Sequence, residues 1–186
     1  AANANPVTAV FMKRYMRDQF EYFGIQTPKR KALQKQFLAQ YGLPTAEQLR
    51  EVIKTLWELP QRECQYVAIE ILARIMKARK PLPIPPQEMV DLIEYLITTK
   101  SWWDSVDAMS TQVVAVFFQK HPDFIKPCTD KWRQSGNPWL QRTTILFQLL
   151  FKEKTDETLL FDTIRQLAGS NEFFIQKAIG WGLREY

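Results

Sequence analysis

Apolar residues recur at helical spacing along nearly the whole chain of 186 residues, and no segment of strand length alternates convincingly between apolar and polar positions. Turn-forming residues interrupt this pattern at 24–28, 41–44, 59–60, 81–86, 98–101, 121–122, 135–138 and 169–171. The pattern predicts an all-α chain of about eight to ten short helices. The proline-rich interruption at 81–86 favours extended backbone and is expected to act as a spacer.

Several helical segments resemble one another at a fixed spacing. Residues 63–69, 139–145 and 174–179 share a pattern with a glutamine in third place, and a fourth copy falls on 103–107, one residue out of register. The implied repeat of about 35 to 40 residues is typical of HEAT or armadillo hairpins. We therefore expect an α-α superhelix, or solenoid, of HEAT-like helical hairpins with a concave cleft, forming one domain over residues 1–186. A helical bundle without repeats is the alternative.

Composition narrows the classes of site. The two cysteines are far apart, and the single histidine, His121, lies in a turn sequence, so a disulfide framework, a zinc site and a Ser-His-Asp triad are not expected. No apolar run is long enough to cross a bilayer and no charged leader is recognised, so we expect a cytoplasmic protein. Residues 1–6 are set aside as a processed or disordered end. The net charge of +5 favours polyanionic partners only modestly.

One group of residues combines an acid with aromatic rings and bases. Trp103 and Asp107 are four residues apart and share a helix face, with Asp104 one step round. Arg142 takes nearly the same place in the following repeat. The repeat after that contributes three residues at helical spacing: Lys177, Trp181 and Arg184. Stacked repeats would bring these side chains to one concave surface, where the basic ones would contact phosphates or simply face solvent.

A structural role for the same residues is the competing interpretation. Aromatic side chains at helical spacing usually fill a core, and we favour that role for Trp102, Trp139, Phe173 and Phe174. Ser101 is the expected N-cap of its helix, which leaves Asp107 in the helix interior. An acid in that position is either half of a structural ion pair or a functional anion that faces a cleft, and spacing alone does not separate the two.

The sequence resembles the bacterial AlkD-type alkylpurine DNA glycosylases of the helical-repeat superfamily. The similarity covers most of the chain, beginning near 14–16 and 24–28, and rests on three motifs in the family's order, at 100–107, at 139–142 with 145–148, and at 172–181 with 183–186. Relatives continue for about one more hairpin, so the resemblance predicts a truncated C-terminal repeat without its cap.

The resemblance implies an enzyme that hydrolyses the N-glycosidic bond of N3- and N7-alkylated purines in double-stranded DNA. By motif, Asp107 is the catalytic anion, Trp103 and Trp181 are aromatic walls, Arg142 is the basic residue of the cleft, and Tyr15 lies close to the lesion. Lys177 and Arg184 are added from helical geometry as DNA-binding residues. The route requires no cofactor and no metal, and we expect a monomer.

Two alternatives stay open at this stage. A DNA-binding member of the superfamily without catalytic activity would keep the basic surface and dispense with the acid. A protein-interaction scaffold, a common use of helical solenoids, would show no salt-dependent binding to DNA.

Overall fold

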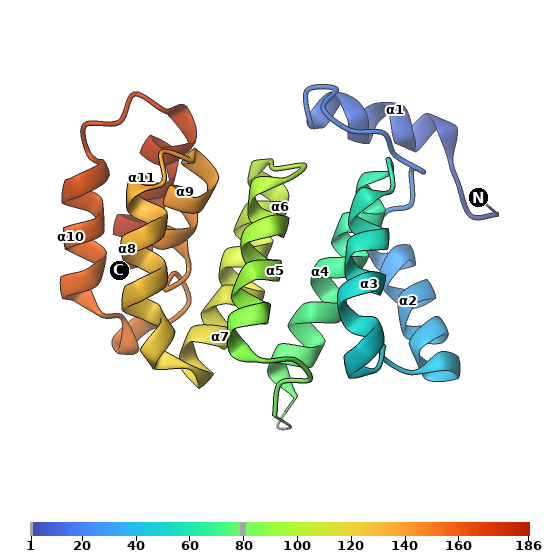
Figure 1. The fold of residues 1–186 in the computed structure, drawn as a ribbon. Helices are drawn as coiled ribbons and strands as arrows, with labels where there is room; N and C mark the ends of the chain where they lie inside the picture. Colours follow the sequence, from blue (N-terminus) through green and yellow to red (C-terminus); the bar gives the residue numbers. More distant parts are fainter. Residues whose placement is uncertain (1, 79–80) are drawn as a thin grey trace. The chain divides into compact units, whose positions relative to one another are not determined.

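Helices make up most of the chain in the computed structural model, which describes residues 2–78 and 81–186 (Figure 1). The α-helices are α1 (Pro6–Tyr15), α2 (Thr27–Tyr41), α3 (Ala46–Glu58), α4 (Arg62–Lys77), α5 (Pro86–Thr98), α6 (Trp103–Met109), α7 (Ala115–Lys120), α8 (Ile125–Gln134), α9 (Pro138–Leu146), α10 (Glu157–Leu167) and α11 (Phe173–Glu185). A π-helical turn (Ser110–Val114) joins α6 to α7, and short 3₁₀ turns occupy Pro122–Phe124 and Lys152–Lys154. The predicted all-α class is confirmed.

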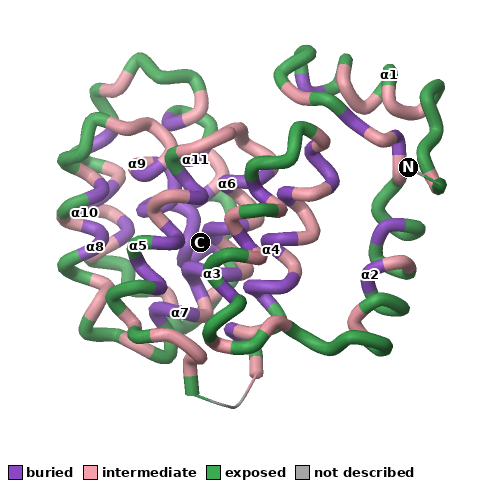
Figure 2. Tube along the Cα trace, turned by 45° about the vertical axis from the view of Figure 1, so that its right-hand side comes forward, coloured by how far each residue is buried: buried purple, intermediate pink, exposed green. Residues whose placement is uncertain are grey.

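The chain divides into two compact units, one ending at Leu72 and the other comprising Ala73–Tyr186. The division falls inside α4, so each unit contains one part of that helix. The expectation of a single helical-repeat domain over residues 1–186 stays a prediction. Each unit has its own buried apolar residues, and Figure 2 shows buried positions in both units.

The first unit begins with a capped helix, and the expectation of a processed or disordered end at residues 1–6 stays a prediction. Asn5 is the N-cap of α1, its side-chain oxygen accepts the backbone N–H of Thr8 at 3.1 Å, and Pro6 takes the first helical position. The backbone N–H of Asn5 also donates to the carbonyl of Phe23 at 2.8 Å. These bonds fix where α1 begins.

The segment after α1 is held by one carboxylate. Glu63, at the start of α4, is buried and accepts the backbone N–H groups of residues 23–25 at 2.9 to 3.1 Å. Gly24 in this segment has a φ of +80°, and a Cβ atom there would lie 2.0 Å from the carbonyl oxygen of Asn5. Only glycine combines that backbone angle with such a close approach to another segment.

The second unit is built around α9. This helix contacts α5, α6, α8, α10 and α11. Its residues Ile145 and Leu146 join one buried cluster with Leu149, from the turn after α9, and with side chains from α10 and α11: Leu160, Leu167, Ile175 and Ala178. A residue in the middle of α9 is therefore surrounded by other helices, and this location decides the environment of Arg142.

The repeated glutamines have a common structural role. The side-chain amide of Gln65 donates to the carbonyl of Trp57 at 2.7 Å and of Leu59 at 2.8 Å, where α3 ends. Gln141 donates to the carbonyl of Arg133 near the end of α8 at 3.0 Å, and Gln176 to the carbonyl of Ser170 after α10 at 3.2 Å. Each glutamine thus binds a carbonyl near the end of the preceding helix, where intrahelical donors are missing. The recurring motif marks the turn of a helical hairpin.

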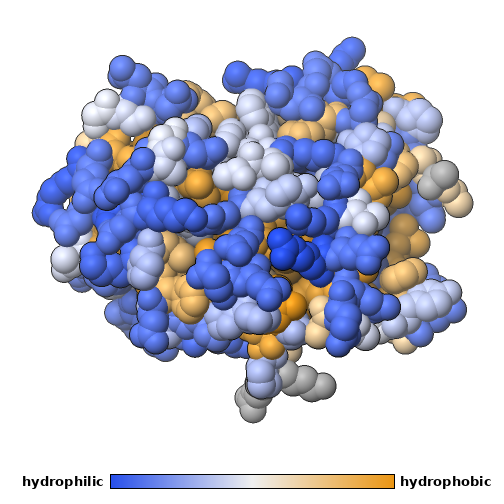
Figure 3. Space-filling view, viewed as in Figure 1, coloured by the Kyte–Doolittle hydropathy of each residue, from blue (hydrophilic) through white to orange (hydrophobic). Residues whose placement is uncertain are grey.

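The exposed surface is mostly hydrophilic on the face shown in Figure 3, with apolar side chains visible between the polar ones. In the described ranges, no helix combines the length and apolar character needed to cross a membrane.

Candidate functional site

Asp107 of α6 and Arg142 of α9 form an ion pair in the second unit. Arg142 donates from Nε to Oδ1 of Asp107 at 2.7 Å and from Nη2 to Oδ2 at 2.8 Å. The two parallel bonds are the bidentate geometry of a guanidinium on a carboxylate, which fixes orientation as well as charge. The side chain of Asp107 is 16% exposed and that of Arg142 is 5% exposed, so the acid alone retains some access to solvent.

The third bonded nitrogen of Arg142 ties the pair to a further helix. Nη1 donates to the backbone carbonyl of Phe174, in the first turn of α11. Nε, Nη1 and Nη2 of Arg142 are therefore all bonded inside the chain. Its expected contact with a DNA phosphate stays a prediction, whereas its contact with Asp107 is direct.

The environment of Asp107 raises its carboxyl pKa above the ordinary value of 3.8. Burial is the main cause, because the carboxylate loses water that would solvate its charge. The hydrogen bond and charge of Arg142 oppose that effect, and the neighbouring charge of Asp104 adds to it. Asp107 is thus a partly desolvated carboxylate, and Arg142 holds it in one orientation.

Three aromatic rings gather beside the pair. The ring of Phe174 lies 5.2 Å from that of Trp102 and 5.0 Å from that of Trp139, and the two indole rings are 6.0 Å apart, all between centroids. The guanidinium carbon of Arg142 is 6.0 Å from the Phe174 centroid. All three aromatic side chains are half-buried, in line with the packing role expected for them. The indole N–H of Trp102 is buried and has no hydrogen-bond partner among the described residues.

Two expectations about neighbouring residues are wrong. Phe173 is 55% exposed and is not part of the core; its ring instead lies 5.4 Å from the ammonium of Lys177. Ser101 is not the N-cap of α6, because Trp102 takes that position and the Ser101 hydroxyl donates back to the carbonyl of Ile97 at 2.6 Å. Serine can bind a carbonyl one turn earlier as readily as it caps a following helix.

Trp103 and Asp104 occupy the first turn of α6, and both are half-buried. Trp103 and Asp107 lie one helical turn apart, as the spacing predicts, so the indole and the carboxylate share a side of α6. The role of Trp103 as an aromatic wall stays a prediction.

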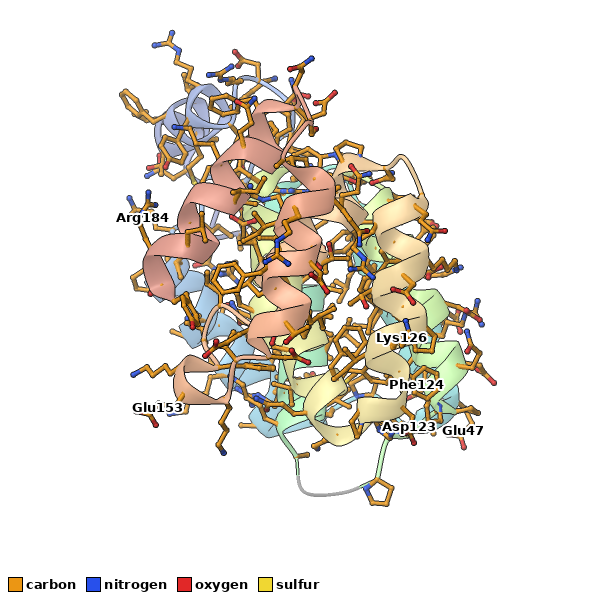
Figure 4. All side chains as sticks on the ribbon, turned by 90° about the vertical axis from the view of Figure 1, so that its left-hand side faces the viewer. Glu47, Asp123, Phe124, Lys126, Glu153 and Arg184 are labelled. Carbon is orange, nitrogen blue, oxygen red and sulfur yellow. The ribbon has the colours of Figure 1, made fainter. Side chains whose placement is uncertain are left out.

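Trp181 of α11 packs against the buried cluster of α9, α10 and α11, and its indole N–H donates to Glu185 at 3.3 Å. This packing places one side of the ring in the interior. Lys177 and Arg184 are exposed on the same helix, and Figure 4 shows the side chain of Arg184 at the outer side of α11. The roles of all three in DNA binding stay predictions.

Tyr15 belongs to the first unit and is 71% exposed. It lines a cleft of about 530 Å³ together with residues of α1, the segment that follows it, and α4: Val7, Thr8, Phe11, Met12, Met16, Tyr22, Gln26 and Tyr66. The Tyr22 and Tyr66 hydroxyls are 3.3 Å apart. This cleft is described within its own unit, and the expected proximity of Tyr15 to a lesion stays a prediction.

Sequence reasoning missed the third contact of Arg142. The carbonyl of Phe174 is 32 residues from Arg142, close to the repeat length, as is the 35-residue separation of Arg142 from Asp107. Equivalent positions in consecutive hairpins therefore meet, and this rule, applied once more along the chain, would have indicated the start of α11. No sequence pattern specifies that a backbone carbonyl is the acceptor.

The part of the chain that the structure describes contains no group of three or more His, Cys, Asp or Glu side chains arranged to hold a metal ion. His121 lies between α7 and the following 3₁₀ turn, with its ring 5.0 Å from that of Phe117, which confirms its place in a turn.

Fold and site together define an all-helical protein in which a partly buried carboxylate is held between helices of consecutive hairpins. The chain belongs to the DNA alkylation repair enzyme family, whose model matches residues 1–186. It is also similar to the solved structure of a predicted DNA alkylation repair enzyme from Enterococcus faecalis, with 37% identity and a TM-score of 0.86, over 98% of this chain and 83% of that one. No curated protein matches. The resemblance read from the sequence and the α-α superhelix class are thereby confirmed.

Proposed function

We propose that this chain is a DNA glycosylase that releases N3- and N7-alkylated purines from double-stranded DNA by hydrolysis of the N-glycosidic bond. The observation that carries the proposal is the Asp107 carboxylate, partly buried, bidentately held by Arg142 and still 16% exposed. Membership of a DNA alkylation repair family supports the substrate class.

The chemistry of the lesion suits a lone carboxylate. A purine alkylated at N3 or N7 carries positive charge and leaves as a neutral base, so it needs no strong general acid. Cleavage of the bond leaves cationic character on the deoxyribose. A fixed anion in a partly dry environment stabilises this charge more strongly than a hydrated one and can orient the attacking water.

Arg142 has a role in this proposal that differs from phosphate binding. An ionised carboxylate offers about four lone-pair sites, and the two bonds to Arg142 leave the others for a water molecule or the sugar. Arg142 also favours the charged form of Asp107 against the effect of burial. It therefore keeps the anion charged and in one orientation.

The tryptophans would contribute by attraction between indole faces and a cation, at about 0.5 to 2 kcal/mol each depending on desolvation. Trp103 precedes Asp107 by one turn and is the better candidate. Because Trp181 packs partly in the core, its replacement by Ala would lower stability as well as activity, so Trp181→Phe is the more informative variant.

The proposal is tested by incubating the protein with duplex DNA that contains one 7-methylguanine and measuring the free base and the abasic strand. Release of 7-methylguanine well above the rate in buffer is expected. Binding to the same duplex without release would instead support the non-catalytic DNA-binding alternative, and absence of salt-dependent DNA binding would support the protein scaffold.

A further inference from the structure

Two fully buried hydroxyl groups join the helical segments that carry Asp107 and Arg142. Ser110, the first residue of the π-helical turn after α6, and Thr143 of α9 are both 0% exposed. Their side-chain oxygens are 3.1 Å apart. This cross-link lies three residues after Asp107 on one segment and one residue after Arg142 on the other.

The two hydroxyls continue into the backbone on both sides. The Ser110 hydroxyl lies 2.7 Å from the carbonyl of Val106, the residue before Asp107. The Thr143 hydroxyl lies 2.9 Å from the carbonyl of Trp139. Each hydroxyl has one proton, so at most two of these three contacts are hydrogen bonds at one time. When Ser110 donates to Thr143 and Thr143 donates to Trp139, the cross-link is made, and the Val106 carbonyl still accepts the backbone N–H of Ser110.

The backbone geometry changes at the same place. The N–H of Ala115 bonds to the carbonyl of Ser110, five residues back, so the π-helical turn begins at Ser110. Such a turn inserts one extra residue and rotates the side chains that follow relative to those before it. The hydroxyl of Thr111 binds the carbonyl of Asp107 at 2.8 Å, which secures the backbone of the last turn before this change.

We propose that Ser110 and Thr143 are positioning residues, whose hydroxyl link sets the separation and rotation of the two segments so that the Asp107 carboxylate meets the Arg142 guanidinium in bidentate register. The expected effect on the rate of base release rests on the proposed function, whereas the effect on the geometry of the ion pair does not.

Hydroxyl groups suit this task better than methyl groups. Apolar contacts tolerate small sliding and rotation, whereas a hydrogen bond weakens steeply outside a narrow range of distance and angle. The ion pair itself needs such precision because both of its bonds must form together.

The test compares Ser110→Ala, Thr143→Val, the double variant and Thr143→Ser with a matched control, Thr144→Val. Thr144 is the next residue of α9, is also 0% exposed, and its hydroxyl binds only within its own helix, to the carbonyl of Gln141 at 2.6 Å. Thr144→Val and Thr143→Val therefore remove equivalent buried hydroxyls, but the cross-link is lost only in Ser110→Ala, Thr143→Val and the double variant, whereas Thr143→Ser keeps a hydroxyl at that position.

The first readout needs neither DNA nor catalysis. Carboxyl ¹³C NMR follows the titration of Asp107, which faces Arg142 and the charge of Asp104. Loosening the pair weakens the lowering effect of Arg142 on the pKa of Asp107, so the titration midpoint is expected to rise in Ser110→Ala and Thr143→Val. It should rise no further in the double variant, and it should return to the wild-type value in Thr143→Ser. Thr144→Val is expected to match wild type.

The second readout is single-turnover release of 7-methylguanine. We expect a rate loss of about 3- to 10-fold in Ser110→Ala, Thr143→Val and the double variant, smaller than the roughly 10²-fold effect of a full 1 Å displacement, with the half-saturating concentration unchanged. A wild-type midpoint in Thr143→Val, or an equal rise in Thr144→Val, would overturn the positioning role. An inactive wild type would refute the glycosylase proposal and leave the NMR result to decide this one.

Discussion

At Asp107, burial and pairing act in opposite directions on the same carboxyl group. Burial favours the protonated form and the bond to Arg142 favours the anion, and burial has the larger effect, so the pKa is raised. In an ordinary ion pair on a protein surface, the carboxylate stays hydrated, so burial does not raise its pKa. Burial of Asp107 together with its pairing to Arg142 supports a catalytic role. A carboxylate held in a partly desolvated place stabilises a nearby positive charge more strongly than a hydrated one does.

This raised pKa predicts a particular dependence of stability on pH. Between the unfolded value near 3.8 and the higher folded value, the folded chain binds more protons at Asp107 than the unfolded chain. The contribution of this group to the free energy of unfolding therefore falls as pH rises through that window and is constant above it. Urea unfolding of wild type and Asp107→Asn at a series of pH values measures the difference between the two proteins. A difference that instead grows with rising pH would indicate a depressed pKa.

Replacement of Arg142 by Gln is expected to lower the free energy of unfolding by about 3–5 kcal/mol, because it leaves a partly buried carboxylate without its charged partner. The control is Arg165→Gln, which removes a 2.7 Å pair with Asp162 in which both side chains are exposed. That change is expected to cost at most about 1 kcal/mol. Equal losses in urea unfolding would show that the Asp107–Arg142 pair is no more than a surface bridge.

At the level of elements, the repeated glutamine explains how three of the described hairpins close. A helix ends with carbonyl groups that have no intrahelical donor, and the glutamine of the next helix supplies one. The three copies differ in burial: Gln65 is buried, Gln141 is half-buried and Gln176 is exposed. Water can replace the amide at an exposed site but not at a buried one.

Replacement of each of the three glutamines by leucine should therefore lower the free energy of unfolding by an amount that follows the burial of the glutamine. Gln65→Leu leaves one buried carbonyl, that of Trp57, and one part-buried carbonyl, that of Leu59, without their amide donor and is expected to cost about 1–3 kcal/mol. Gln176→Leu should stay within about 0.5 kcal/mol, and Gln141→Leu should fall between them. Thermal or urea unfolding of the three variants gives the order, and a larger loss at Gln176 than at Gln65 would contradict the explanation.

Sequence patterns predicted the elements better than their ends. Helical periodicity located the segments because burial follows it directly, as in α3, where the buried residues Leu49, Ile53 and Trp57 are one helical turn apart. The start of α6 was missed, because Ser101 has a carbonyl within reach one turn back and uses it instead of capping. The π-helical turn at Ser110 was also not predicted, since one extra residue hardly changes a helical pattern over a short window.

For the whole molecule, the repeat length was the most informative feature of the sequence. It predicted that Asp107 and Arg142 lie on one surface of neighbouring repeats, and the structure shows them in direct contact. The repeat could not decide between a structural pair and a functional anion, because that distinction depends on burial. It also could not show that Arg142 is enclosed by α9's neighbours and bonded to Phe174.

The modest net charge predicts binding to DNA that weakens with salt, since each neutralised phosphate releases counterions. If Arg184 contacts a phosphate, Arg184→Ala should weaken binding and reduce the slope of log affinity against log salt by about 1. Lys126→Ala is the control, because Lys126 is exposed on α8 (Figure 4) and is paired with Asp130 at 2.7 Å. Fluorescence anisotropy with duplex DNA measures both slopes, and equal slopes for wild type and Arg184→Ala would exclude that contact.

The most direct test of the account is the single-turnover rate of 7-methylguanine release by wild type, Asp107→Asn and Asp104→Asn under saturating protein. Asp104 is the neighbouring acid on α6 and carries the same charge, so its variant controls for net charge. Loss of the anion should lower the rate by roughly 10²-fold or more, as removal of one electrostatic group in an active site does, while Asp104→Asn stays within a few-fold of wild type. Full activity in Asp107→Asn, or an equal loss in both variants, would contradict the assignment of Asp107 as the catalytic anion.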